Sequence, residues 1–161
     1  MKNLRITALL ISILFAFSCS SEEEDGEDQD TLLNTPVAGT IYGEAFEISG
    51  NGGKASDINA NEVESVYIYL TAQDLGCDAP DGTEFPVTIL APREVGTHNT
   101  NVSASFKDPN STDYVSTTNI TVEIISVGET VVGKVMGGSL SEGNEINGKF
   151  AVPYCTATAL N

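Results

Sequence analysis

Residues 63–71 read VESVYIYLT, a stretch in which two kinds of side chain alternate. One face of an extended chain collects the aliphatic residues Val66, Ile68 and Leu70. The opposite face collects Tyr67, Tyr69 and Thr71. A repeat of two residues is typical of a β-strand that turns one face toward a core. The stretch therefore predicts a strand whose aliphatic face is buried.

The same alternation recurs in later segments, one of them over residues 85–91, which are also predicted as strands. Their expected inward residues are Val87, Ile89 and Ala91; Val102, Ala104 and Phe106; Ile120, Val122 and Ile124; and Phe150, Val152 and Tyr154. Weaker strands are predicted over residues 39–43, 45–49, 114–117 and 130–136. Clusters of Gly, Asn, Asp and Pro separate these segments and predict turns, one of them over residues 49–53. This pattern predicts an all-β domain, an antiparallel β-sandwich of about 8–10 short strands, with a lipocalin-like β-barrel as the alternative.

The composition is strongly acidic. The chain of 161 residues has 23 acidic and 7 basic residues, which gives a formal charge of −16. Such a field repels nucleic acid and anionic membrane surfaces, so neither is an expected direct partner.

The N-terminus combines a basic start with a short apolar run. Lys2 and Arg5 precede the segment ITALLISILFAF, which ends just before Ser18 and Cys19. This arrangement is typical of a secretory signal, and we expect it to span residues 1–18. An uncleaved membrane anchor is the alternative, but a membrane-spanning helix needs about 20 apolar residues.

The boundary itself carries a resemblance. The stretch Ala16-Phe17-Ser18-Cys19 resembles the lipobox of bacterial lipoproteins, in a relaxed form that occurs in lipoproteins of the Bacteroidetes type. The resemblance implies cleavage between Ser18 and Cys19, and attachment of acyl chains to Cys19. Several acyl chains hold a protein on a membrane more firmly than one.

The acidic run that follows is a second part of the resemblance. Residues 20–25 read SSEEED and are similar to the export signal of the same lipoproteins, which implies display on the cell surface. The alternative is a plain tether at the periplasmic face of the outer membrane. Residues 19–36 are predicted to be a disordered acidic tether because they are highly charged and poor in apolar residues. Residues 37–161 are predicted to be the folded domain.

Two cysteines remain once Cys19 is lipidated. An oxidising compartment beyond the inner membrane favours a disulfide between Cys77 and Cys155. A nucleophilic cysteine, or a metal site with His98, lacks the usual ligand spacing. His98 itself is predicted to lie in a turn, and the sequence marks no acid–base or nucleophile set. We therefore expect no enzyme activity and no cofactor.

Calcium is a second metal that the sequence brings into question. Residues 74–84 and residues 108–113 each offer several oxygen ligands. Neither matches a regular calcium-binding loop, and Asp, Asn and Gly also favour plain turns. We predict solvated turns at both places and no metal site.

The domain also resembles a group of Bacteroidetes-type lipoproteins without an established activity. The resemblance rests on Gly39, Ile41, Gly43, Phe46, Cys77 and Cys155, and on the closing stretch NGKFAVPYC. It implies an all-β lipoprotein. We expect a binding or interaction module for an extracellular glycan or protein. A lipocalin-like carrier of an apolar ligand and a structural envelope protein are the alternatives.

Overall fold

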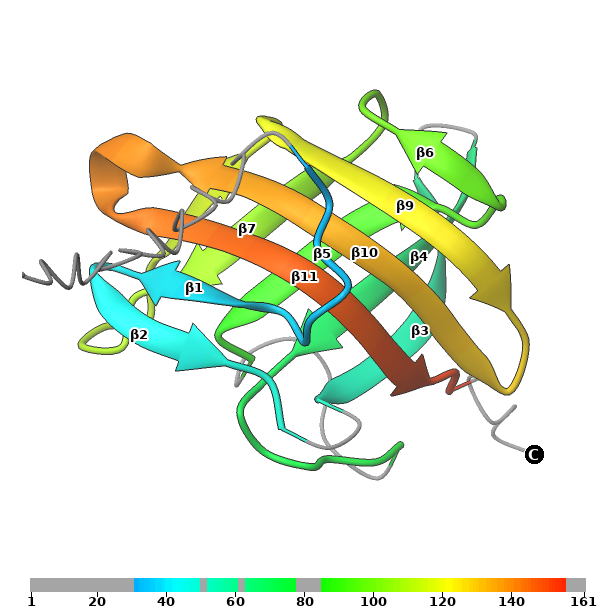
Figure 1. Cartoon of the computed structure of the whole chain (residues 1–161), viewed down its shortest axis with the longest axis horizontal. Coiled ribbons are helices and arrows are strands. Elements are labelled where there is room, and N and C mark those ends of the chain that lie inside the picture. The colour runs from blue at the N-terminus through cyan, green and yellow to red at the C-terminus, as the bar shows by residue number, and fades with distance from the viewer. Residues whose placement is uncertain (1–30, 50–51, 61–62, 78–84, 156–161) are drawn as a thin grey trace, which may run out of the picture.

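The fold is a β-sandwich of two antiparallel sheets (Figure 1). It is taken from a computed structural model that describes residues 31–49, 52–60, 63–77 and 85–155. The strands within these ranges are β1 (Ala38–Ile41), β2 (Glu44–Glu47), β3 (Gly53–Ala60), β4 (Val63–Leu70), β5 (Val87–Pro92), β6 (Gly96–His98), β7 (Ser103–Lys107), β8 (Tyr114–Thr117), β9 (Ile120–Val127), β10 (Thr130–Ser139) and β11 (Asn144–Pro153). A short 3-10 helix, η1 (Leu140–Glu142), joins the last two.

The strand order rules out the barrel alternative. One sheet, sheet A, has the order β2-β1-β11-β10-β9-β6, and the other, sheet B, has the order β3-β4-β5-β7-β8. Consecutive strands form the meanders β3-β4-β5 and β9-β10-β11, while the chain changes sheets after β2, β5, β6 and β8. The sheets keep separate edges, so the predicted β-sandwich is confirmed and the lipocalin-like barrel is wrong.

The core lies between the two sheets and contains the residues that alternation predicted. Val66, Ile68 and Leu70 are completely buried. The inward sets of β5, β7 and β9 are likewise buried, as are Phe150 and Val152. Tyr154 differs from the prediction, because it is only half-buried and bonds to polar groups at the edge of the domain.

Two strands were missed. We predicted a turn over residues 49–53 and no strand directly after it, but β3 pairs with β4 along its whole length, from Gly53 opposite Leu70 onward. Its sequence GKASDINA shows little alternation of apolar and polar residues. A strand at the edge of a sheet buries few side chains and is held mainly by main-chain hydrogen bonds to its neighbour, so it needs no such pattern. The other missed strand is β6. His98 is the last residue of this strand and does not lie in a turn as predicted.

The outer face of sheet B is also partly covered. Tyr69 is 6% exposed although it points away from the main core. Its ring packs against Phe85, with the centroids 5.0 Å apart, and the ammonium of Lys54 lies 5.9 Å from the Tyr69 centroid. Phe85 precedes β5 and does not begin it, contrary to the predicted strand. β4 therefore has apolar contacts on both faces near its end.

The segment before β1 lies across sheet A (Figure 1). The side chain of Asn147 accepts a hydrogen bond from the Leu33 amide and donates one to the Thr31 carbonyl, each 3.0 Å long. The Lys149 amide donates to the Thr35 carbonyl at 2.7 Å. Contacts with the sandwich therefore begin upstream of residue 37, where we placed the domain boundary.

Candidate functional site

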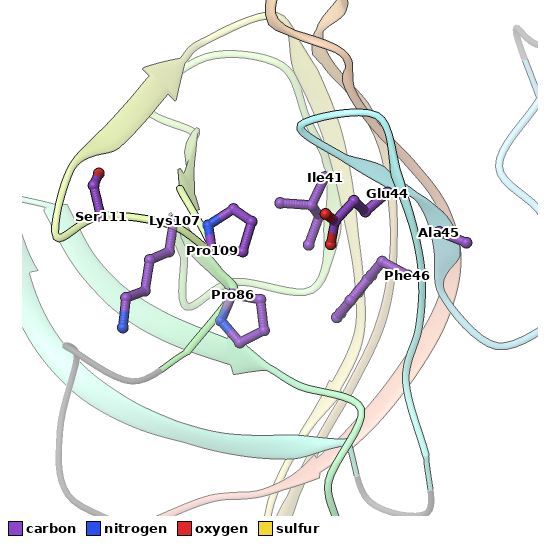
Figure 2. A pocket seen from close by; sticks show the side chains of 8 residues that line it. All are labelled: Ile41, Glu44, Ala45, Phe46, Pro86, Lys107, Pro109 and Ser111. Atoms are coloured by element: carbon purple, nitrogen blue, oxygen red, sulfur yellow. The ribbon is translucent and has the colours of Figure 1, made fainter.

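A groove of about 300 Å³ opens at one end of the sandwich (Figure 2). It lies between β2 in sheet A and the adjoining ends of β5 and β7 in sheet B. Its lining consists of Ile41, Glu44, Ala45, Phe46, Pro86, Lys107, Pro109 and Ser111. Most of these side chains are apolar, so the groove suits an apolar group that enters from solvent.

The turn between β1 and β2 fixes one wall of the groove. Tyr42 and Gly43 have φ angles of 50° and 77°, the left-handed conformation that a two-residue hairpin turn requires. The Gly43 amide donates to the Gly143 carbonyl at 2.9 Å, and the Tyr42 amide donates to Asn144 Oδ1 at 2.7 Å. The turn is thus fastened to the connection between β10 and β11, which positions the start of β2.

Asn144 is a buried polar residue on which this turn depends. It occupies an inward position of β11 and is completely buried. Its Nδ2 has no hydrogen-bond partner among the residues that the structure describes. An unsatisfied buried group costs about 1–3 kcal/mol, and the bond from Oδ1 to the strained turn offsets part of this cost.

The loop between β7 and β8 forms the opposite wall. Asp108 Oδ1 accepts the Asn110 amide at 2.8 Å, and Ser111 Oγ accepts the Asp113 amide at 3.0 Å. These bonds hold the loop as a compact turn. Pro109 therefore presents a rigid ring to the groove, beside that of Pro86 (Figure 2).

The charges of the groove are not symmetric. Figure 2 shows the Glu44 carboxylate directed into the groove, whereas the Lys107 ammonium points away from it. The side chain of Glu44 is largely exposed to solvent. The groove thus combines an apolar floor with a negative charge at its mouth.

The neighbouring Tyr42 is affected by the same acidic surroundings. Burial raises the pKa of its hydroxyl most, followed by the negative charges of Asp108, Glu142 and Asp113. A hydrogen bond from the Val115 main chain lowers this pKa and offsets part of the increase. Tyr42 therefore stays neutral in the folded protein at a pH where an unfolded tyrosine has begun to ionise.

This shift predicts how stability depends on alkaline pH. Below about pH 10 the Tyr42 hydroxyl is protonated in both states and contributes no pH dependence. Above that pH the unfolded state loses the proton first, so the free energy of unfolding decreases as pH rises. Tyr42→Phe should reduce this decrease in urea unfolding at about pH 9 and pH 11. Equal decreases in the variant and the natural protein would contradict the prediction.

A second polar cluster surrounds Arg93 at another edge of the sandwich. Its guanidinium donates to Asp57 at 2.8 Å, to Glu64 at 2.6 Å and to the Tyr154 hydroxyl at 3.1 Å. The hydrogen bond with Tyr154, followed by those with Glu64 and Asp57, raises the pKa of Arg93 further above its usual high value. The Tyr154 hydroxyl in turn donates to Asp57. Every group here has a partner, so the cluster serves as a clamp between β3, β4, β5 and the end of β11.

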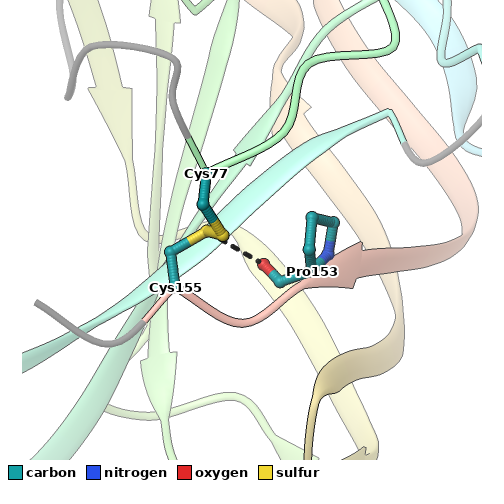
Figure 3. Close-up of a disulfide and its surroundings, with 3 residues drawn as sticks. All are labelled: Cys77, Pro153 and Cys155. Atoms are coloured by element: carbon teal, nitrogen blue, oxygen red, sulfur yellow. Dashed lines mark hydrogen bonds between the residues drawn. A yellow bond between two sulfur atoms is a disulfide. The ribbon is translucent and has the colours of Figure 1, made fainter. Parts of the chain in front are cut away.

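The predicted disulfide is confirmed (Figure 3). Cys77 and Cys155 are bonded, with their Cα atoms 5.4 Å apart and 78 residues apart in sequence. The Cys155 amide donates to the Ala55 carbonyl at 2.7 Å, so the linked tail covers the edge of β3. Cys155 Sγ also lies 3.7 Å from the Pro153 carbonyl oxygen, a plain contact because a disulfide sulfur has no proton. Neither sulfur is available as a nucleophile or as a metal ligand.

Removing this link should weaken the domain considerably. In the chain-entropy account, a cross-link over such a long loop stabilises by roughly 4 kcal/mol. We expect the double variant Cys77→Ser/Cys155→Ser to unfold at a clearly lower urea concentration than the oxidised protein. The reduced natural protein is the matched control and should unfold where the variant does. A midpoint that is the same with and without reductant would contradict the prediction.

The other sequence predictions have different outcomes. His98 Nε2 donates to the Glu94 carbonyl at 2.8 Å, a local bond from the end of β6 to the segment that precedes this strand. The described residues contain no group of three His, Cys, Asp or Glu side chains that could hold a metal ion. Residues 78–84 of the first calcium candidate lie outside the described ranges, as do Ser18 and Cys19.

Sequence reasoning did not find the groove. Its residues come from three separate stretches, residues 41–46, Pro86 and residues 107–111, and none of them forms a local motif. The usable signal was the pair Pro86 and Pro109, which stand just outside β5 and β7 at the same end of sheet B, although Pro86 was expected inside a strand.

A polar depression of about 360 Å³ is a further surface feature. It is lined by residues of β9, β10, β11 and their connections, namely Asn99, Thr118, Asn119, Ile120, Thr121, Met136, Gly137, Gly138, Leu140 and Glu145. Amide, hydroxyl and carboxylate groups dominate, and Leu140 adds an apolar side chain that is 66% exposed.

Comparison of the chain with protein-family profiles, with curated proteins and with solved structures finds no match. Within the described part of the chain, no helix has the length and apolar character needed to cross a membrane.

Proposed function

We propose that this protein is a lipoprotein of the outer membrane, attached through acylated Cys19, whose β-sandwich binds a ligand outside the cell. The basic and apolar N-terminus, the lipobox-like stretch that ends at Cys19 and the acidic run after it support the anchor. The acidic run favours the cell surface over the periplasmic face. The groove between β2, β5 and β7 supports binding and is the observation that carries the proposal.

The groove defines what kind of group would bind. Its volume of about 300 Å³ and the apolar floor of Ile41, Phe46 and the two prolines suit one aliphatic or aromatic group. The carboxylate of Glu44 at its mouth favours a ligand with a positive charge next to that group. Burial of one such side chain stabilises a complex by about 1.5–3 kcal/mol. The groove alone therefore gives weak affinity, and a specific ligand needs contacts beyond it.

The chemistry of the lining favours binding over catalysis. Glu44, Lys107 and Ser111 supply one carboxylate, one amine and one hydroxyl, and the amine points away from the carboxylate. Acid–base catalysis needs two groups that face a common reacting atom. We therefore propose a non-enzymatic role for this site.

A glycan ligand is the second candidate, because of the polar depression on sheet A. Its side-chain amides, hydroxyls and the Glu145 carboxylate are groups that can bond to sugar hydroxyls. The exposed Leu140 would contact the apolar face of a sugar ring. A carrier of a large apolar ligand is less well supported, since bulky buried side chains fill the space between the sheets.

The anchor is tested by labelling with radioactive palmitate in the cells that produce the protein. The natural protein should incorporate the label, and Cys19→Ala should not, because the thiol is the proposed site of acylation. The variant Cys77→Ser is the matched control for loss of a cysteine and should still be labelled. Continued labelling of Cys19→Ala would contradict the anchor.

The groove is tested with the neutral dye Nile red, which fluoresces in apolar surroundings. We expect saturable binding to the natural protein. Ser111→Trp places a large ring at the groove and should abolish most of the fluorescence, because the ring fills the space that the dye would occupy. Ser126→Trp, an exposed position on β9, is the control and should leave binding unchanged. Equal fluorescence for both variants would show that the dye binds elsewhere.

A further inference from the structure

The strand β2 has an edge that the described residues leave without a neighbouring strand. It is terminal in sheet A and pairs with β1 on one side. The Ile48 amide donates to the Val37 carbonyl at 3.0 Å, which sets the alternation of the ladder. In an antiparallel ladder every second residue bonds to the same neighbour. The main-chain N–H and C=O groups of Ala45 and Glu47 therefore point outward, away from β1.

The other terminal strands are covered or short. The bonded tail at Cys155 lies against β3, where Ala55 also forms a bridge with Tyr154. β6 consists of three residues. β8 is four residues long and contributes no residue to the lining of the groove. Among the strands that the structure describes, β2 is thus the terminal strand that borders the groove and presents outward main-chain groups.

The charges on β2 select its partner. Glu44 and Glu47 are both exposed and three residues apart, so their side chains lie on opposite faces of the strand. A second copy of this strand would place glutamates near glutamates, which opposes self-pairing. The residues after position 36 include sixteen acidic and five basic ones, which repels other acidic chains as well. The occupant that this edge fits is a positively charged one.

We propose that an extended, basic peptide segment of a partner protein binds by adding to β2 as a seventh strand of sheet A. Its main chain pairs with the outward groups of Ala45 and Glu47. Two lysines or arginines spaced three residues apart face Glu44 and Glu47, and an apolar side chain opposite Phe46 enters the groove. This inference rests on the proposed binding function of the groove and names the class of its ligand.

Strand addition supplies what the groove lacks. Main-chain hydrogen bonds contribute affinity that does not depend on sequence, while the groove and the two carboxylates select the side chains. The Glu44 carboxylate turns into the groove, so it lies on the face that the apolar residue of the peptide would share. The whole recognition surface is therefore built from one strand and the ends of two others.

The test uses the full chain and the blocked peptide Thr-Lys-Val-Thr-Lys-Thr. When this peptide pairs antiparallel to β2, its two lysines lie opposite Glu44 and Glu47 and its valine lies opposite Phe46. Binding is measured by calorimetry, and main-chain contacts by amide hydrogen exchange in NMR. We expect exchange to slow at Ala45 and Glu47 and to stay unchanged at Glu44 and Phe46, which already bond to β1. A groove ligand that does not extend the sheet would not produce this alternation.

Two control peptides separate the contributions. Thr-Val-Lys-Lys-Thr-Thr has the same composition with adjacent lysines, and should bind at least roughly fivefold more weakly because its charges do not match the spacing. The probe peptide methylated on the two nitrogens opposite Ala45 and Glu47 should not bind detectably, because it cannot form the ladder. Equal binding of either control and the probe would overturn the proposal.

Charge reversal on the protein gives an independent test. Glu44→Lys/Glu47→Lys should lose roughly tenfold or more in affinity for the probe and bind Thr-Glu-Val-Thr-Glu-Thr instead. Glu94→Lys/Glu129→Lys changes the net charge equally at exposed sites away from β2 and should keep the original preference. If both double variants lose affinity for the probe peptide to the same extent, the attraction is a general effect of net charge and the proposal fails.

The outcome also distinguishes this inference from the proposed function. Absence of peptide binding, while Nile red still binds and Ser111→Trp still abolishes its fluorescence, would overturn strand addition and leave the groove as a site for another apolar ligand. Absence of both would overturn the two together.

Discussion

The pairing of the first strand with the last is the constraint on which the other features depend. β1 joins β11 with Ala38 opposite Asn147, and β2 is attached to the domain through β1. The groove is lined by β2 and by residues at the ends of β5 and β7, so it too requires this long-range contact. Such non-local pairing cannot form until most of the chain is available, which makes slow folding the expectation for this topology.

Sequence patterns predicted the parts of the fold in which side chains are sorted by burial. Val66, Ile68 and Leu70 lie in the core as expected, because strands with one buried face carry their own signal. β3 carries no such signal, since its place is set by hydrogen bonds to β4. The burial of Tyr69 was not predicted, because the cover on the outer face of sheet B comes from the chain after β4. Phe85 in that chain was placed in the strand that follows it.

The candidate site was beyond prediction for a related reason. The Cys77–Cys155 pair could be expected from parity and compartment, without knowledge of the topology. The groove instead depends on which strand ends meet, and local patterns do not encode the crossings between sheets. The direction of the Glu44 carboxylate also depends on the hairpin turn at Tyr42. That turn is held by the hydrogen bond from the Tyr42 amide to Asn144 Oδ1.

The position of the disulfide has a mechanical consequence under the proposed anchoring. Drag on the displayed domain would be transmitted through the segment before β1, whose main chain bonds to Lys149 on β11. β11 is the central strand that would take this load, and its far end is fastened covalently to Cys77 through Cys155. Pulling the end of β11 away from β3 would therefore break a hydrogen bond to Ala55 and also load the covalent link to the chain after β4. Under this anchoring, the strand that would bear the pull is also the one whose far end is covalently held.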